Sequence, residues 1–320
     1  TQQEGSSTQQ EPAPGDDVVL NLNHDIQETL YNTLFNTLRT ANLGRAAAIV
    51  QDPRSGAVLG MVSFPGYDNN IFNSAVSQEE FEKLFLSPGK PLFNRVVSGL
   101  YNPGSVIKPF IGMAGLEEGV ITRNTTIQDC VNIAIPNPLK PDEPTVYKNW
   151  RVDLGPFNLR RAIADSCNVF FYTLGGGHND ISGLGISRIA KYLKSAWADM
   201  ILGIDLPGEE KGFVPTPEWK RKNTNENWYL GDTYNISIGQ GDLVVSPLWI
   251  NSYISAIANG GTMYKPSVVN RIVDNSKNPI RVFQPDALGR LPFKDEVIRE
   301  VKRDMQETVL SGTAKLLSGL

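Results

Sequence analysis

The sequence has few of the side chains that metal centres and histidine-based active sites require. Its only cysteines are Cys130 and Cys167, and its only histidines are His24 and His178. Two cysteines are too few for a zinc cluster or a disulfide framework. A single disulfide stays open, but we expect two free thiols in the core or in loops. With so little histidine a Ser-His-Asp triad is disfavoured, which makes a lysine the more attractive base.

Long apolar runs and an excess of positive charge are also missing. No stretch approaches the roughly eighteen apolar residues that span a bilayer. The formal net charge of −4 gives no basic footprint for nucleic acid. There is no secretory signal, and the chain opens without a methionine. We expect either a soluble piece of a longer protein or a chain whose anchor has been removed.

What is present suits a globular protein, with 40% hydrophobic and 20% charged residues. Residues 1–17 are polar, which predicts a disordered linker. The rest mixes helical periodicity with short strand-like runs, which predicts an α+β fold. Helices are expected at 25–40, 105–116, 159–165, 169–174, 246–258 and 295–310. Hairpins are expected at 45–63 and 267–283.

Three other segments are dominated by turn-forming residues. The range 124–151 contains four prolines, which predicts a long irregular stretch. The second segment is 203–209, in which Asp205 and Glu209 are expected to be exposed loop carboxylates. The run Gly239-Gln240-Gly241 is expected to be a tight turn, although a functional loop stays open.

The most informative stretch is 101–110. Pro103 and Gly104 are helix breakers, and the apolar run after them predicts a helix that starts at Ser105. Lys108 lies three residues further on, so the two side chains share one face of the first turn. A desolvated lysine can lose its proton near neutral pH and act as the base that a serine nucleophile needs. The stretch is therefore typical of a Ser-x-x-Lys acylation site.

This Ser-x-x-Lys interpretation has a plainer alternative, and so has a second polar motif further along the chain. An isolated Ser-x-x-Lys pattern is better explained as a helix cap followed by a solvated lysine, and the second match, 87–90, has a Pro-Gly centre that predicts a turn. Ser166 and Asn168 form a Ser-x-Asn pair that could simply be a polar turn between helices. The other match, 276–278, is better explained as a hairpin loop. What favours function is that Ser166 and Asn168 lie between two apolar helices downstream of Ser105.

In this order the segments resemble the transpeptidase domain of class B penicillin-binding proteins, most of all the elongation type. The resemblance covers 18–320 and implies a β-lactamase/transpeptidase-like fold, with an antiparallel sheet flanked by helices and an all-helical subdomain. The matching segments are 101–110, 166–172, 203–209, 237–241, 246–248 and 258–261.

The resemblance also implies a mechanism. Ser105 would attack the penultimate D-alanine carbonyl of a peptidoglycan stem peptide, with its own N–H as an oxyanion donor, and Lys108 would accept the hydroxyl proton. Ser166 would pass a proton to the leaving amine, and Asn168 would bind both Lys108 and the substrate amide. β-Lactams would acylate Ser105. No cofactor or metal is implied.

The expected setting follows from the same resemblance. The domain would face the periplasm at the bacterial inner membrane, held by an anchor absent from this chain. The expected partners are a glycosyltransferase and other elongation-complex proteins.

One part of the family pattern is missing. The third motif, Lys-Ser/Thr-Gly, is not found, and 194–196 is nearest but lacks the glycine. In the family a segment like 312–315 comes shortly before that motif. We therefore expect truncation just upstream of it, with the last strands and the second oxyanion donor absent. Such a fragment should have an open sheet edge and little or no activity alone.

Two other functions stay open. The same acylation with water as acceptor would make a D,D-carboxypeptidase or a serine β-lactamase, which the mid-chain segments disfavour. A penicillin-binding sensor or scaffold without turnover would be consistent with the missing third motif.

Overall fold

The computed structural model describes residues 15–319 except 74, 138, 139 and 141. The linker expected at 1–17 therefore lies mostly outside the described residues, and Asp17 already belongs to the first strand.

The described chain contains nine strands and ten α-helices, with short 3₁₀ and π turns between them. The strands are β1 Asp17–Leu20, β2 Ala46–Gln51, β3 Val58–Phe64, β4 Cys130–Ile135, β5 Thr145–Asp153, β6 Thr262–Tyr264, β7 Val269–Val273, β8 Pro279–Val282 and β9 Ala287–Arg290. The helices are α1 His24–Ala41, α2 Gln78–Phe81, α3 Lys108–Glu117, α4 Leu159–Ala164, α5 Asn168–Gly176, α6 Gly185–Ser195, α7 Pro217–Thr224, α8 Leu230–Ser237, α9 Pro247–Asn259 and α10 Asp295–Leu310.

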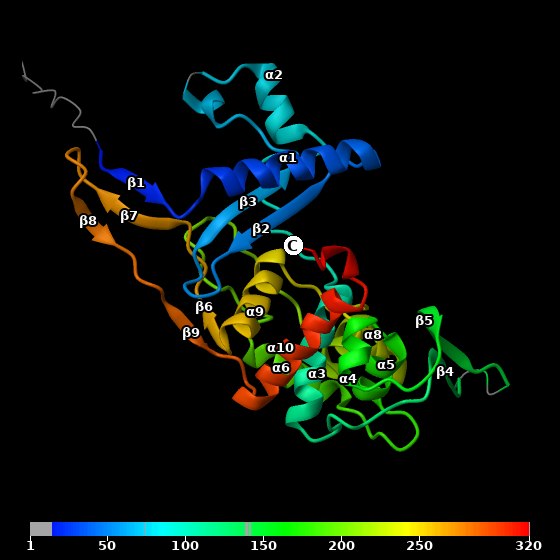
Figure 1. Ribbon diagram of the computed structural model, residues 1–320. Coiled ribbons are helices and arrows are strands. Elements are labelled where there is room, and N and C mark those ends of the chain that lie inside the picture. The colour runs from blue at the N-terminus through cyan, green and yellow to red at the C-terminus, as the bar shows by residue number, and fades with distance from the viewer. Residues whose placement is uncertain (1–14, 74, 138–139, 141, 320) are drawn as a thin grey trace, which may run out of the picture.

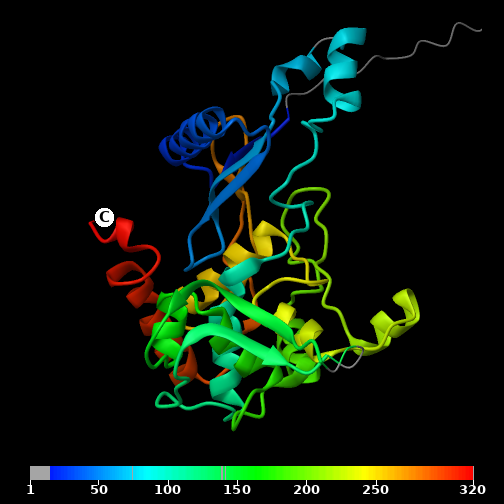
Figure 2. The ribbon, with the colours of Figure 1, turned by 90° about the vertical axis from the view of Figure 1, so that its right-hand side faces the viewer.

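The strands form short antiparallel sheets, as the α+β expectation requires. One sheet has the order β1-β7-β8, and the others are the pairs β2-β3, β4-β5 and β6-β9. Helix α1 lies along the β2-β3 pair, and α9 packs against β2 and β6. Most of the remaining helices gather into a body below the sheets, from which the β4-β5 hairpin projects, whereas α2 lies at the opposite end of the molecule, beyond α1 (Figures 1 and 2).

Local sequence signals explain the boundaries of the longer helices. Asn23 caps α1, since its side chain accepts the N–H of Ile26 at 3.0 Å. Ser246 caps α9 in the same way, and that helix ends at Gly260 with φ +93°, a conformation that suits glycine. The helices expected from 25, 246 and 295 are thereby confirmed within a residue or two.

The range 124–151 was expected to be one long irregular stretch, and this prediction is wrong. The range contains the paired strands β4 and β5. The prolines of this range all fall between position 135, where β4 ends, and position 145, where β5 begins. Proline cannot donate to a strand ladder, so the connection is rich in proline while both strands are free of it. The four prolines therefore predict the connection between the strands correctly, but they say nothing about the strands on either side.

Most buried apolar side chains of the described residues form a single cluster. Its centre is an aromatic group around Phe110 of α3, which contacts Trp249 and Tyr253 of α9 and Phe293 just before α10. A second, small cluster of Leu38, Val62 and Phe64 lies under α1. None of the described helices has both the length and the apolar character needed to cross a membrane.

Candidate active site

The segment with Ser105 is a tight turn at the start of a buried helix. Gly104–Ile107 forms a 3₁₀ turn that runs directly into α3, so the expected helix is present but begins in a tighter form. Ser105 is exposed at this tip, whereas Lys108, one turn below, is only 1% exposed. Pro109 lacks an N–H but falls in the first turn of α3, where none is needed. The turn thus presents a hydroxyl to solvent above a buried amine.

Among the described residues, the hydrogen-bond partners of the Lys108 amine are all neutral. It donates to the backbone oxygen of Ser166 at 2.7 Å, to Ser166 Oγ at 3.0 Å and to Asn168 Oδ1 at 2.7 Å. The ring of Phe171 lies 5.5 Å away. Burial lowers the pKa of Lys108 to about 7, because the charged form loses its hydration. A large fraction of this lysine is therefore neutral at neutral pH.

Ser166 connects the lysine to the nucleophile. Its hydroxyl donates to Ser105 Oγ at 3.0 Å while it accepts from Lys108 Nζ at the same distance. The structure therefore brings the four predicted residues together, Asn168 included. It links Ser105 to Lys108 through Ser166, whereas the sequence suggested a direct contact.

The nucleophile faces two adjoining cavities. One, of about 340 Å³, is lined by Ser105, Trp150, Ser166, Asn168, Ile238, Gln240 and Thr313. The other, of about 450 Å³, has mostly apolar walls from α9 and α10, including Ile254 and Met305. A polar side and an apolar side beside one hydroxyl suit a substrate that has both characters.

Trp150 and Gln240 are site residues that the sequence interpretation missed. Trp150 lies on β5, in the range expected to be irregular, where the run of β-branched and aromatic residues from 145 is a strand signal that could have placed it. Gln240 belongs to the glycine-flanked run that was expected to be only a turn, and its side chain is exposed toward the cavity.

Gly239 holds that run against the nucleophile turn. Its carbonyl accepts the N–H of Gly104 at 2.8 Å, and its φ is +73°. A Cβ at Gly239 would lie 2.2 Å from the backbone oxygen of Gly104. Only glycine permits this contact, so the run serves both as a tight turn and as part of the site.

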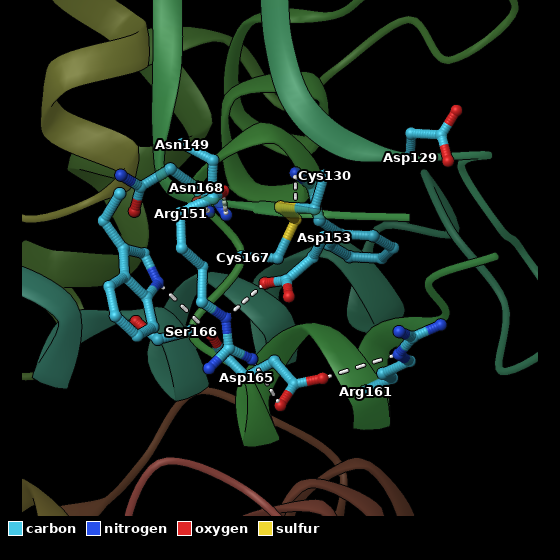
Figure 3. Close-up of a disulfide and its surroundings, with 12 residues drawn as sticks. Asp129, Cys130, Asn149, Arg151, Asp153, Arg161, Asp165, Ser166, Cys167 and Asn168 are labelled. Atoms are coloured by element: carbon cyan, nitrogen blue, oxygen red, sulfur yellow. Dashed lines mark hydrogen bonds and ion pairs between the residues drawn. A yellow bond between two sulfur atoms is a disulfide. The ribbon is translucent and has the colours of Figure 1, made fainter. Parts of the chain in front are cut away.

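The free-thiol expectation is wrong. Cys130, at the start of β4, is disulfide-bonded to Cys167, which precedes α5, with a Cα–Cα distance of 5.9 Å (Figure 3). Cys167 lies between Ser166 and Asn168, so the bond is part of the site's surroundings. The two cysteines are 37 residues apart, and the spacing alone does not show that the fold brings them together.

The expectation that Asp205 and Glu209 are simple exposed loop carboxylates is only partly right. Asp205 is exposed, but it accepts the N–H groups of Val268 and Val269, each at 2.7 Å. Glu209 is half-buried and accepts the N–H groups of Gly203 and of both its neighbours. Both carboxylates therefore order backbone turns.

The two chance matches are where the sequence placed them. Lys90 donates its N–H to the carbonyl of Ser87 at 2.9 Å, which makes that Ser-x-x-Lys match a turn. The Ser-x-Asn match at 276–278 lies between the paired strands β7 and β8. Neither match lines the cavities beside Ser105.

A serine hydroxyl joined through a second hydroxyl to a buried lysine defines the class of active-serine acyl-transfer enzymes that use lysine where others use histidine. The chain belongs to the penicillin binding protein transpeptidase domain family, because residues 46–318 match the sequence pattern of that family. The family and the β-lactamase-like fold implied by the resemblance are thereby confirmed.

Named relatives and solved structures to which the chain is similar include a peptidoglycan D,D-transpeptidase and PBP2 proteins. The peptidoglycan D,D-transpeptidase MrdA of Escherichia coli (strain K12) is 34% identical over 256 residues, which cover 79% of this chain and 39% of that protein. The structure of Pseudomonas aeruginosa PBP2 in complex with WCK 5153 has a TM-score of 0.80 at 33% identity, over 96% of this chain and 63% of that one. The complex between PBP2 and MreC from Helicobacter pylori gives a TM-score of 0.72 at 29% identity, over 91% of this chain and 48% of that one. The chain therefore spans about two-fifths of the length of the curated relatives it matches.

Proposed function

We propose that residues 18–320 belong to the transpeptidase domain of a peptidoglycan D,D-transpeptidase that forms an acyl-enzyme on Ser105. The observation that supports this most is the position of Ser166 Oγ, 3.0 Å from both Ser105 Oγ and Lys108 Nζ. Hydroxyl, relay and buried amine are then in place without any movement of the backbone. The name of the Escherichia coli relative supplies the substrate class.

The first half-reaction is an acyl transfer from the stem peptide to the serine. Ser105 Oγ attacks the carbonyl carbon of the penultimate D-alanine, while its proton moves to Ser166 Oγ and the proton of Ser166 moves to neutral Lys108. The same path then returns a proton to the amide nitrogen, the C–N bond breaks, and the terminal D-alanine leaves as an amine. An ester on Ser105 remains.

The surrounding groups have defined parts in this step. Asn168 Oδ1 holds one N–H of Lys108, and its amide group is available to the substrate peptide. The N–H of Ser105 lies in the first turn of the 3₁₀ segment, where backbone donors have no intrahelical partner and can stabilise the oxyanion.

The second half-reaction closes the cross-link. The amine of a neighbouring stem peptide attacks the ester carbon, Ser105 Oγ leaves with a proton, and an amide joins the two peptides. A β-lactam would mimic the D-alanyl-D-alanine end and leave the ester in place.

We also propose an extracytoplasmic location and an elongation-type assembly. The Cys130–Cys167 disulfide favours an oxidising compartment. The Helicobacter pylori relative occurs in a complex with MreC, which supports a similar scaffold partner here.

Labelling of the full-length protein with a fluorescent penicillin tests the proposal. We expect a stable adduct on Ser105 that is absent from Ser105→Ala, and cross-linked product from stem-peptide substrates. Rapid release of the label would instead indicate a β-lactamase. A stable adduct without cross-linking would indicate a sensor, and an unlabelled protein would contradict the proposal outright.

A further inference from the structure

The backbone at Ser166 is in a conformation that must be held in place. Its φ is +54°, in the left-handed region that is unfavourable for a residue with a Cβ. Such a conformation persists only where the surrounding structure determines it, and it is typical of functional sites. The hydroxyl of Ser166 must also stay within 3.0 Å of two partners. Some other element must therefore fix the Ser166 loop, residues 165–168.

The β4–β5 hairpin fixes the second half of this loop. Cys130 is bonded to Cys167 by the disulfide, and both residues are fully buried. Asn149 of β5 accepts the N–H of Asn168 at 2.9 Å, a donor at the start of α5 that has no partner in the helix (Figure 3). The residues on both sides of the disulfide, Ser166 and Asn168, are the two that hold the amine of Lys108.

The hairpin fixes the first half of the loop through Asp165. The indole N–H of Trp150 donates to the backbone oxygen of Asp165 at 3.3 Å, and Arg151 donates to its carboxylate at 3.0 Å. Asp153 holds Arg151 in turn at 2.5 Å (Figure 3). The Arg151 guanidinium also lies over the Trp150 ring. The same short strand thus contacts the loop on both sides of Ser166.

We propose that the β4–β5 hairpin is a clamp that positions Ser166 and Asn168 for acylation, with the Cys130–Cys167 disulfide as its covalent anchor. This rests on the proposed function, and the clamp residues Cys130, Asn149 and Arg151 are positioning residues. Without the clamp the loop relaxes away from the left-handed conformation at Ser166. The relay to Ser105 then lengthens, and water reaches Lys108.

The clamp can be loosened at two independent points. In Cys130→Ala/Cys167→Ser the covalent link is lost, but a serine oxygen still replaces the Cys167 sulfur that accepts the N–H of Phe170 at 3.3 Å. Asn149→Ala leaves the disulfide intact and removes two hydrogen bonds within the clamp, the acceptor for the Asn168 N–H and the bond of 2.8 Å that the Asn149 amide donates to the backbone oxygen of Arg151. The matched control is Asn21→Ala, because the Asn21 amide joins two distant segments, with bonds of 3.2 Å and 3.3 Å to 267 and 269.

The measurement is the second-order rate constant of penicillin acylation of the full-length protein between about pH 5 and 9, together with its thermal unfolding. Loosened clamp variants should acylate more slowly by on the order of tenfold to a hundredfold. The rise of the acylation rate with pH, which we call the acid limb, should move above pH 7 in these variants, because a hydrated lysine recovers a higher pKa. Asn21→Ala should lower the unfolding temperature and leave the acid limb where it was.

The outcomes separate the clamp from the proposed function. Folded clamp variants with an unchanged rate and an unchanged acid limb would overturn the clamp. If the double variant does not fold, Asn149→Ala decides the matter alone by the same two readouts. A failure of the proposed function would show in the unaltered protein, as the absence of an adduct on Ser105.

Discussion

Lys108 and Lys220 show how the surroundings of one residue decide its chemistry. Both are buried, at 1% and 8% exposure. Burial acts to lower the pKa of Lys220, but the hydrogen bond and charge of Asp232, with Glu226 nearby, outweigh it and raise that pKa. Within the described part of the chain Lys108 donates to neutral oxygens and lies near the Phe171 ring, so burial governs its pKa and lowers it to about 7. One lysine is a structural cation, and the other can accept a proton.

The pH dependence of acylation should follow from this difference. The neutral amine is the active form, so the acylation rate should rise with pH, pass half its maximum near pH 7 and level off above it. Lys108→Arg should abolish this limb and lower the rate by about 10²–10⁴-fold, because a guanidinium does not deprotonate. Lys220→Arg is the matched control and should keep both the rate and the limb. Penicillin labelling across pH measures all three, and normal labelling of Lys108→Arg would exclude the lysine as base.

Gly239 offers a second test at a single residue. Gly239→Ala places a Cβ against the backbone of Gly104 and also occupies a positive φ. Gly185→Ala has the same φ of +73° but open space around its Cβ. We expect Gly185→Ala to lose about 1–2 kcal/mol of unfolding free energy from φ alone. Gly239→Ala should lose about 1–3 kcal/mol more and acylate more slowly.

Urea unfolding and penicillin labelling of both variants check this expectation. Equal losses of stability, with equal acylation rates, would show that the contact between Gly239 and Gly104 does not hold the nucleophile turn.

Among the elements, α10 is tied to α4 by a buried carboxylate. Asp304 of α10 is 2% exposed and accepts from the half-exposed Arg160 at 2.9 Å. Burial raises the pKa of Asp304, and the hydrogen bond and charge of Arg160 offset only part of that rise. Helix α4 leads directly into the Ser166 loop, so the ion pair between Arg160 and Asp304 helps to hold the helix that carries this loop.

The two ends of this ion pair should not be equivalent. Arg160→Ala leaves a buried carboxylate without its cation and should cost about 3 kcal/mol of unfolding free energy at pH 7. Asp304→Asn leaves a half-exposed guanidinium that water can solvate, so its cost should stay within about 1 kcal/mol. Urea unfolding at pH 7 measures both, and equal costs would show that the carboxylate is better solvated than its burial implies.

The loss in Arg160→Ala should also depend on pH. A raised pKa means that the folded protein keeps the proton of Asp304 where the unfolded chain has released it. Stability contributed by this group therefore falls as pH rises above the ordinary aspartate range, and it recovers as pH falls. The unfolding free energy of Arg160→Ala should therefore lie closer to that of the unaltered protein at about pH 4.5 than at pH 7.

The elements that deliver the site could be predicted where their signals are local. Four-residue apolar spacing marks α1, and a serine cap with a glycine end marks α9. The β4–β5 hairpin could not be predicted as easily, because its prolines hide the strands beside them. The four residues at the site could be named from spacing and order, but the relay through Ser166 depends on a backbone at φ +54°. The disulfide likewise depends on tertiary contact across 37 residues.

At the scale of the whole molecule, the described chain has one large apolar cluster and one small one. The large cluster contains the buried faces of α3 and α5, which carry Lys108 and Asn168, and Ser105 lies in the 3₁₀ turn that runs directly into α3. The small cluster joins α1 to the β2–β3 pair, and Leu38 is its helical member. Figures 1 and 2 show α1 on the outer side of that pair, away from the helical body. We therefore expect that the region under α1 can open without disturbing the site.

Leu38→Ala tests this separation. Removal of a buried leucine side chain should cost about 2–5 kcal/mol, felt mainly within the small cluster. Hydrogen exchange of α1 amides should accelerate, since local opening sets their rate, while penicillin acylation of Ser105 stays unchanged. Met113→Ala, fully buried on α3 in the large cluster, should instead lower both global stability and acylation.

The separation could fail where β2 and β3 also meet the large cluster, since Val58 belongs to that cluster and Ala47, Ile49 and Met61 pack against it. A hydrogen bond adds to this contact. Gln51 at the end of β2 accepts a hydrogen bond from Asn251 of α9 at 3.0 Å, and α9 packs on α3 through Tyr253 and Phe110. If opening under α1 also withdrew β2 from α9, Leu38→Ala would slow acylation as Met113→Ala does. Gln51 is the last residue of β2, and β2 stays paired with β3 through Val58 there, so this end of the hairpin should hold while α1 opens. Equal slowing in both variants would mean that α1, β2 and α9 open as one cooperative unit.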